Sequence, residues 1–170
     1  MTTHIGTDGA NPTDLVDALA GPNWHSAYQS LVAMGTDALS AIRKGLHHEQ
    51  WQVRRWSAAC VDQTADAETL HALIPLLDDP KSIVRVWAVH SISCEHCREC
   101  ANPIDVVPLL LRRLQLDTSI RVRRMAAAML VHLPPDERAT PVLETVLGST
   151  EDRKLRLHVG RALARQRSAS

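Results

Sequence analysis

The fold is decided by a pattern whose clearest copy is the stretch Asp79-Pro80-Lys81-Ser82-Ile83-Val84-Arg85-Val86-Trp87-Ala88. Its second half consists of an apolar residue, an arginine, two variable positions and then small residues. The same order recurs in Val53–Ala58, Val122–Ala127 and Leu155–Gly160, and a weaker copy ends at Ala33-Met34-Gly35. Repetition at intervals of about 30–40 residues is typical of chains that stack one helical unit on the next.

A second apolar segment precedes each of the four clear copies. It contains a leucine that lies seven or eight residues before the apolar–arginine pair, at Leu46, Leu77, Leu114 and Leu147. Each copy is therefore predicted to be a hairpin, in which one helix ends near the leucine and the next carries the pattern. Residues 78–80 and 134–136 have the composition of turns, and Asn102-Pro103 predicts the start of a helix.

The sequence thus predicts an all-α fold, an α-solenoid of about five stacked helical hairpins, because one hairpin cannot bury its apolar face alone. Small residues such as Ala58, Ala88 and Ala126 let the second helices approach closely. We expect one domain over residues 12–166, a flexible N-terminus over 1–11 and a flexible tail over 167–170. A compact bundle of helices is the alternative all-α arrangement, and it explains the repeat spacing less well.

These repeats resemble the HEAT-repeat family, especially the short bacterial HEAT-like repeats of phycobilisome lyases. Repeats of that kind contain aspartate-proline, a few residues, valine-arginine, and then alanines and a leucine, as the stretch at 79–88 does. The resemblance covers residues 12–166 and implies an armadillo-like helical solenoid. It implies no single function, because the family includes scaffolds, lyases and nucleic-acid enzymes.

Composition and charge exclude several classes of protein. No apolar stretch approaches the ~18 residues that a membrane-spanning helix needs, so we expect no membrane association. Nineteen basic residues balance nineteen acidic ones, which argues against wholesale non-specific binding to nucleic acid. The N-terminus lacks the features of a signal peptide, which predicts a cytoplasmic protein. Nucleotide-binding and hydrolase motifs are missing, so the sequence predicts no catalytic residues and favours a role without enzymatic activity.

The repeated arginines have acidic residues a few positions before them. The arginines are Arg54, Arg85, Arg123 and Arg156, and the acids are Glu49, Asp79, Asp117 and Asp152. In the repeats that this chain resembles, such acids and arginines pair between adjacent turns and hold the stack in register. A stripe of arginines that binds phosphate is the alternative.

The leading functional hypothesis is an adaptor that binds another protein along the concave face of the solenoid. In the repeat register, the two positions after the arginine and one position three residues further face away from the stack. That register places Trp56 and Trp87 on one surface, about 10 Å apart, and turns Ala59 outward as well. Tryptophan, methionine and arginine are enriched where proteins bind one another. The candidate partner-binding residues are Trp56, Trp87, His90, Met125, His158 and Arg161.

One alternative concerns the same two tryptophans, and a separate expectation concerns the other two. Distorted helices could tuck Trp56 and Trp87 into the core, which would leave no aromatic surface. Trp24 and Trp51 lie at the start of their helices and are expected to clamp one turn on the next.

The last helix carries a basic face. Residues 119–170 hold ten basic and five acidic residues, a net charge of +5. Lys154, His158, Arg161 and Arg165 recur at helical spacing on one side. This face is either the solvated end of the stack or a surface for an acidic partner or nucleic acid.

An insertion that follows the third copy contains three cysteines. Val84 and Val122 are 38 residues apart, whereas the neighbouring intervals are 31 and 33. We expect free thiols and no cofactor. The alternative is a zinc site of Cys94, Cys97 and Cys100 with His132, His96 or Cys60 as a further ligand. An iron–sulfur cluster fits less well, because Ile104 stands where the fourth cysteine of a ferredoxin-like run belongs.

Two further functions stay open through the resemblance. HEAT-like repeats also form DNA glycosylases, which use tryptophans, an arginine and an aspartate on the concave face. Their catalytic pattern cannot be matched here residue by residue, although Trp56 and Trp87 could resemble such a surface. A bilin lyase is the other possibility, and only the similarity of the repeats supports it.

Overall fold

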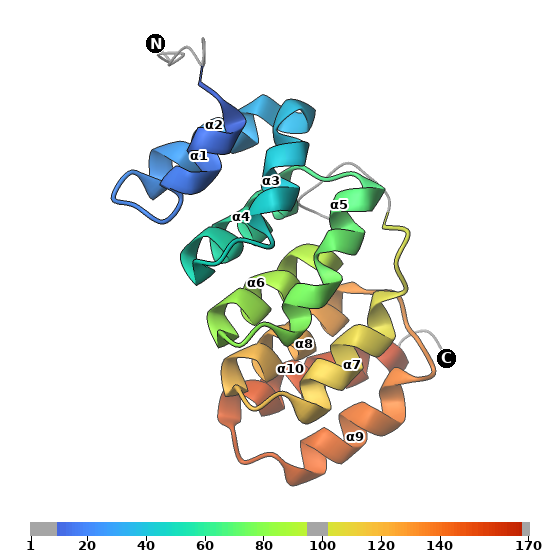
Figure 1. Cartoon of the computed structure of the whole chain (residues 1–170). Helices are drawn as coiled ribbons and strands as arrows, with labels where there is room; N and C mark the ends of the chain where they lie inside the picture. Colours follow the sequence, from blue (N-terminus) through green and yellow to red (C-terminus); the bar gives the residue numbers. More distant parts are fainter. Residues whose placement is uncertain (1–9, 95–101, 168–170) are drawn as a thin grey trace, which may run out of the picture.

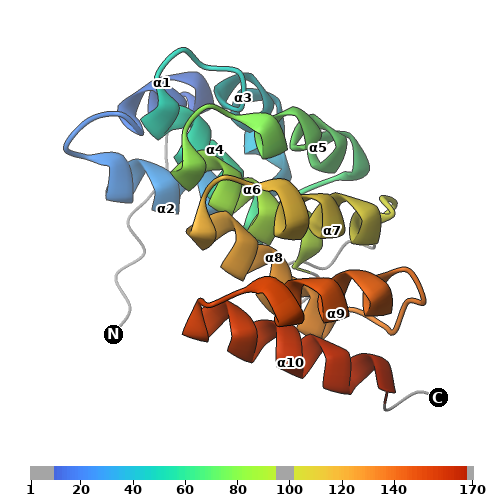
Figure 2. The same ribbon diagram turned by 90° about the horizontal axis from the view of Figure 1, so that it is seen from below.

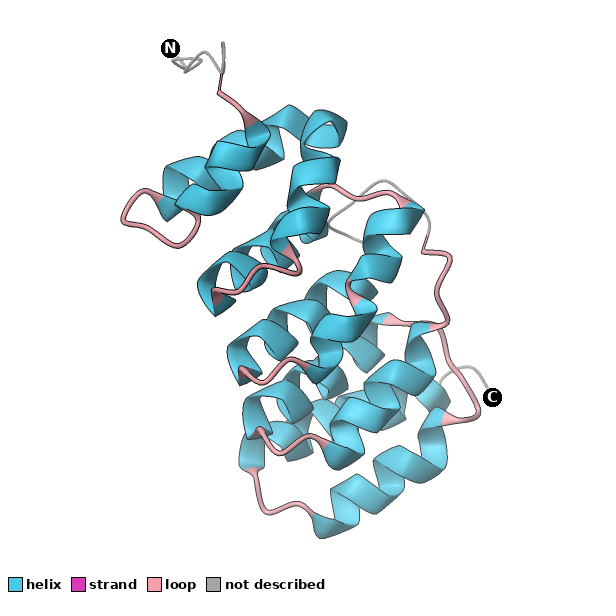
Figure 3. Ribbon diagram, in the orientation of Figure 1, coloured by secondary structure: helices cyan, strands magenta, loops and turns pink. Residues whose placement is uncertain are grey.

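The computed structural model describes residues 10–94 and 102–167, and these residues form helices and connections without a strand (Figures 1 and 3). Most of the predicted flexible termini, residues 1–9 and 168–170, lie outside the described residues. The helices are α1 (Pro12–Ala18), α2 (Trp24–Met34), η1 (Gly35–Ala38), α3 (Leu39–Gly45), α4 (Trp51–Gln63), α5 (Ala67–Ala72), η2 (Ile74–Asp78), α6 (Ser82–Ser93), α7 (Val106–Leu116), α8 (Ile120–His132), α9 (Ala139–Ser149) and α10 (Arg153–Arg167). Here η denotes a short 3-10 helix.

Successive helices pair into hairpins that stack in chain order, from α1 and α2 at one end to α9 and α10 at the other (Figure 1). In the third hairpin, the first element consists of α5 and η2. The predicted α-solenoid of helical hairpins is therefore confirmed.

The hairpins form two layers (Figure 2). The first helix of each hairpin lies in one layer, and the second helices, α2, α4, α6, α8 and α10, lie in the other. The second helices α4, α6, α8 and α10 contact one another more extensively than the first helices do. Closer packing on one side of a stack favours curvature toward that side, which here is the layer of the second helices.

The core runs along the whole stack between the two layers. The repeated apolar residue of the sequence pattern is fully buried in each clear copy, at Val53, Val84, Val122 and Leu155. Ala58, Ala88, Ala126 and Ala127, which follow the arginine in three of the copies, are fully buried as well, so these helices can approach their neighbours closely. Isolated hairpins could not reproduce this core, because every hairpin buries its apolar side against its neighbours.

Helix starts follow the expected chemistry in some places only. Asn11 caps α1, since its side chain accepts a hydrogen bond of 2.9 Å from the backbone N–H of Thr13, and Pro12 occupies the first helical position. The same dipeptide at Asn102-Pro103 does not begin a helix, and that prediction is wrong. Asn102 instead donates a hydrogen bond of 2.6 Å to the carbonyl oxygen of Ile92, which fastens the connection to the end of α6.

No helix in the described part of the chain is both long and apolar enough to cross a membrane.

Candidate functional site

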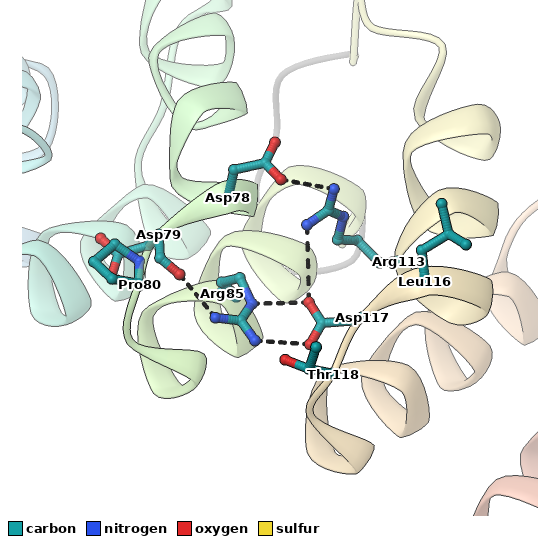
Figure 4. Close-up of a pocket in the computed structure, with 8 residues that line it drawn as sticks. All are labelled: Asp78, Asp79, Pro80, Arg85, Arg113, Leu116, Asp117 and Thr118. Atoms are coloured by element: carbon teal, nitrogen blue, oxygen red, sulfur yellow. Dashed lines mark hydrogen bonds and ion pairs between the residues drawn. The ribbon is translucent and has the colours of Figure 1, made fainter.

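An arginine–aspartate ladder fixes the spacing of the hairpins at their turns. Arg54 donates hydrogen bonds of 2.6 and 3.2 Å to the carboxylate of Asp79 in the next hairpin. Arg85 does the same to Asp117, with two bonds of 2.8 Å (Figure 4). Both contacts are bidentate, the geometry in which guanidinium and carboxylate bind most strongly. The ladder therefore links consecutive hairpins through the repeated residues of the sequence pattern.

In the fourth hairpin, the arginine that takes part in the ladder lies one residue later than the repeat pattern predicts. Arg124, rather than the expected Arg123, binds Asp152 of the fifth hairpin through both carboxylate oxygens. Arg123 donates to the carbonyl oxygen of Leu114 instead, at 2.9 Å. Glu49 joins only through its backbone, because its carbonyl oxygen accepts from Arg54. These contacts engage Arg54, Arg85 and Arg123 within the stack, which favours the structural ladder over a phosphate-binding stripe.

Asp117 is the most enclosed carboxylate of the ladder. Its side chain is 1% exposed, and Arg113 lies 3.8 Å away on its other side while donating to the carbonyl oxygen of Leu77 (Figure 4). Burial by itself would raise the pKa of Asp117, but hydrogen bonds from Arg85 and from the backbone N–H of Ser119 outweigh it and hold the pKa below its ordinary value. The carboxylate therefore stays charged and holds its arginine partners.

The second-helix layer carries a row of aromatic rings that crosses three hairpins. Trp24 of α2 stacks on Trp56 of α4, with ring centroids 3.9 Å apart and planes 11° from parallel. Trp56 lies 6.3 Å from Trp87 of α6, and the edge of His90 meets Trp87 at 5.8 Å. Tyr28 lies 6.0 Å from Trp56. We call these five residues the aromatic row.

Trp56 and Trp87 are neither fully exposed on the surface nor fully buried in the core, the two arrangements that the sequence allowed. Both side chains are half-buried and pack against the core, yet both keep part of their surface in solvent. Their rings are closer than the predicted separation, because the large rings extend toward each other across the gap between α4 and α6. Ala59 is 1% exposed, so the expectation that it faces outward is wrong.

Two members of the row were not identified from the sequence. Trp24 was expected to clamp neighbouring turns, but it stacks on Trp56 and not against the core. Trp51 does pack against the core. Tyr28, one helical turn after Trp24, gave a usable signal, since aromatic residues at i and i+4 lie on one face of a helix.

A cation covers part of the aromatic row. The guanidinium carbon of Arg55 lies 4.2 Å from the centre of the Trp56 ring. Burial lowers the pKa of Arg55, and within the described part of the chain no acceptor meets its Nε atom. The positive charge is therefore held against the negative face of the indole, which is the cation–π arrangement.

The other candidate partner-binding residues continue along the second helices. Met125 on α8 is half-buried and packs against the core. On α10, His158 is half-buried and Arg161 is exposed. The pKa of His158 is lowered by burial first and then by the charges of Arg161 and Arg124. His158 is therefore neutral at pH 7 and adds no charge to the basic face.

Helix α10 nevertheless presents many cations to solvent. Its exposed basic residues are Arg153, Lys154, Arg156, Arg161, Arg165 and Arg167. Arg156 donates to the carbonyl oxygen of Thr150, and Arg167 pairs with Glu144, both within the last hairpin.

The cysteines are arranged differently from the zinc site considered above. Cys97, Cys100 and His96 lie outside the described residues. Cys60 is fully enclosed, and burial raises the pKa of its thiol to about 12, so the thiol is protonated at neutral pH. In the described ranges, the side chains that meet near Cys94 are Asp62 and His90, and neither His132 nor Cys60 belongs to this group.

Comparisons with known proteins agree with the architecture. The family model described as HEAT repeats matches residues 13–93 and 92–164. No curated protein matches the chain. Among solved structures, the chain is similar to an engineered protein of the Northeast Structural Genomics Consortium, with a TM-score of 0.57 and 18% sequence identity over 92% of this chain and 71% of that one. At this identity the likeness shows the fold alone.

Proposed function

The chain belongs to the HEAT-repeat family, and from this membership we propose that it is a non-enzymatic adaptor that binds another protein. The binding surface is the concave side of the solenoid, formed by the second helices. The observation that carries the proposal is the aromatic row, in which Trp24, Trp56 and Trp87 come from three consecutive hairpins and remain partly exposed.

Folding alone does not account for indoles at these positions. The core of this chain is filled by leucine, valine, isoleucine and alanine, and the rings of the row lie at its margin. Large aromatic side chains supply much contact area, and few of their torsions have to be fixed on binding. Because Trp24 and Trp56 already hold each other in place, the row is ordered before a partner arrives, which reduces the entropic cost of association.

The charges beside the row define the partner further. Arg55 lies over Trp56 on α4, and the exposed cations of α10 lie at the last hairpin of the same layer. We expect a partner segment with apolar anchors that cover the indoles and acidic residues that reach α10. Such an adaptor would act in the cytoplasm, where a thiol such as that of Cys60 remains reduced.

The test compares partner capture by the wild-type chain and by a Trp56→Ala/Trp87→Ala variant in extracts of the source organism. We expect the double variant to remain helical by circular dichroism and to lose the captured protein. Leu116→Ala is the matched control, because Leu116 is 71% exposed on the first-helix layer and should not affect capture.

Loss of folding in the double variant would make the result uninformative, so Trp24→Ala serves as a second variant. Its ring rests on Trp56 and not on the core, and its removal should weaken capture without unfolding the chain. Undiminished capture by both variants would exclude the aromatic row as the binding surface.

A second candidate function rests on the exposed cations of α10. If this helix binds nucleic acid, affinity for an oligonucleotide must fall steeply as salt is raised, and Arg161→Ala/Arg165→Ala must reduce that salt dependence. The same assay with alkylated DNA tests the glycosylase alternative, since released base would demonstrate an enzyme. A bilin lyase would transfer a tetrapyrrole, which the adaptor does not.

A further inference from the structure

Three side chains able to bind a metal meet where α4 and α6 end. Asp62 is the penultimate residue of α4, and His90 lies in the last turn of α6. Cys94 lies four residues after His90, at the C-cap position directly after the last residue of α6. Since positions i and i+4 of a helix lie on one side, α6 presents an imidazole and a thiol together toward the carboxylate on α4.

The distances are close to those of a metal centre. Asp62 Oδ1 lies 3.3 Å from His90 Nε2. One ligand atom from each of the three residues, including the sulfur of Cys94, lies within 4.8 Å of the other two. Zinc bonds of about 2.0–2.3 Å at tetrahedral angles separate ligand atoms by about 3.5 Å. The carboxylate and the imidazole already have about this spacing, and the sulfur of Cys94 lies within 4.8 Å of both ligand atoms.

We propose that Asp62, His90 and Cys94 bind a zinc ion that joins the ends of α4 and α6. This proposal does not depend on the adaptor function. A thiolate, an imidazole and a carboxylate form a donor set that zinc accepts, whereas calcium and magnesium prefer oxygen ligands alone. Two anionic ligands balance the charge of the ion, and a fourth position remains for water or a further donor.

The burial of Asp62 supports the same assignment. The side chain of Asp62 is 6% exposed and that of His90 is 24% exposed. A carboxylate removed from water needs a cation beside it, and a metal supplies more charge than an imidazolium does. The rival arrangement is an ion pair in which His90 is protonated and no metal is bound.

The zinc site would also stiffen the aromatic surface. The His90 ring meets Trp87 edge-on at 5.8 Å, with an angle of 90° between the planes. Coordination of His90 fixes the orientation of its ring, and through this contact it restricts Trp87. The metal therefore connects two hairpins and one end of the aromatic row.

Cobalt provides a direct test, because a Co²⁺–thiolate bond produces an intense charge-transfer absorption that an ion pair cannot produce. Tag-free, metal-depleted protein is titrated with Co²⁺ and then with Zn²⁺. We expect the absorption to saturate at one ion per chain, to disappear when Zn²⁺ is added, and to be absent in Cys94→Ser. His90→Ala and Asp62→Asn should weaken Co²⁺ binding at least tenfold. His132→Ala, which removes the histidine first considered as a ligand, should have no effect.

The variant Cys97→Ser/Cys100→Ser separates this site from a cluster of the neighbouring thiols. Retention of the absorption in that variant supports the proposal. The proposal would be overturned if Cys97→Ser/Cys100→Ser lost the absorption while His90→Ala and Asp62→Asn fully retained it. It would also be overturned if the wild-type protein bound neither Co²⁺ nor Zn²⁺. Thermal melting shows whether each variant is folded. Zn²⁺ should raise the Tm of the wild-type chain and leave the Tm of Cys94→Ser unchanged. An equal rise in both proteins would contradict the assignment.

Discussion

The guanidinium group of Arg85 donates two hydrogen bonds, each of 2.8 Å, to the carboxylate of Asp117, which follows it by 32 residues in the sequence. This pair joins the third hairpin to the fourth across the connection that contains the inserted cysteines. The two side chains are 11% and 1% exposed, so the pair is largely removed from water. Its loss should therefore affect the stability of the whole stack.

Asp117→Asn is expected to lower the free energy of unfolding by about 3–5 kcal/mol, because it leaves the charge of Arg85 without its partner. The folded chain holds the pKa of Asp117 below its ordinary value. The stabilisation is thus complete above the unfolded pKa of about 3.9 and is lost as the pH falls toward the lower folded value. Urea denaturation at a series of pH values should show a steeper decline below about pH 4 for the wild-type chain than for the variant.

Asp105→Asn is the matched control for that experiment. Asp105 also binds an arginine, Arg138, but the two side chains are 57% and 47% exposed. Exposed ion pairs contribute only about 0–1 kcal/mol, so this variant should stay close to the wild-type chain at pH 7. Equal losses in both variants would mean that burial does not determine the strength of these pairs.

Gly45→Ala is expected to destabilise the chain by about 1–3 kcal/mol, as overpacking does. A Cβ atom at Gly45 would lie 2.2 Å from Ser57 Oγ and 2.8 Å from Val16 Cγ1, so α3 could not keep its close contact with α1 and α4. Gly148→Ala is the control, because nothing lies within 4 Å of a Cβ atom there. Gly148 lies within α9, and alanine there should raise stability by about 0.5–1 kcal/mol. Thermal melting of the two variants should therefore shift in opposite directions.

Ala126→Asp is expected to unfold the chain. Ala126 is fully buried on α8, in the layer where α6, α8 and α10 pack closely. A carboxylate without a partner costs several kcal/mol there, against a total stability of about 5–15 kcal/mol. Circular dichroism should show the loss of helix. The control Ala164→Asp, at an exposed position on α10, should remain folded. A folded Ala126→Asp protein would show that Ala126 does not lie in the core.

The repeats could be predicted because one short pattern specifies both the core and the ladder. The apolar residue before each arginine is buried, and the arginines Arg54 and Arg85 bind the aspartates of the following hairpins. Each arginine contacts an aspartate of the following hairpin, so equivalent positions in successive copies meet wherever the hairpins stack in the same register.

Interactions that depend on small shifts between hairpins could not be predicted in the same way. Asp152 lies four residues before Arg156, whereas Asp79 lies six residues before Arg85. Asp152 is therefore closer to its helix, where it accepts from the backbone N–H of Leu155, and it meets Arg124 instead of Arg123. Likewise, Asn11 and Asn102 both precede proline, and only the tertiary contact of Asn102 with Ile92 distinguishes them.

The ligands of the candidate metal site were hard to predict from the sequence for a different reason. The spacing of the cysteines predicted Cys94 as a ligand but neither Asp62 nor His90, because a single aspartate or histidine in a helix is not a motif. The register of the repeats does indicate that Asp62 and Cys94 lie close together. Counted from Val53 and Val84, Asp62 and Cys94 occupy neighbouring positions of successive copies, which places them at the same end of adjacent second helices.

The indole rings of Trp24, Trp56 and Trp87 belong to three successive hairpins, so their overlap depends on how each hairpin is rotated relative to the next. A solenoid changes shape by small rotations of this kind, summed along the stack. Flexing of the first three hairpins must alter the electronic coupling between these rings, while Trp51, packed on the core, changes little. The ultraviolet spectrum of the chain therefore changes with the curvature of the solenoid. The indoles that cause this change lie on the surface that a bound partner would deform.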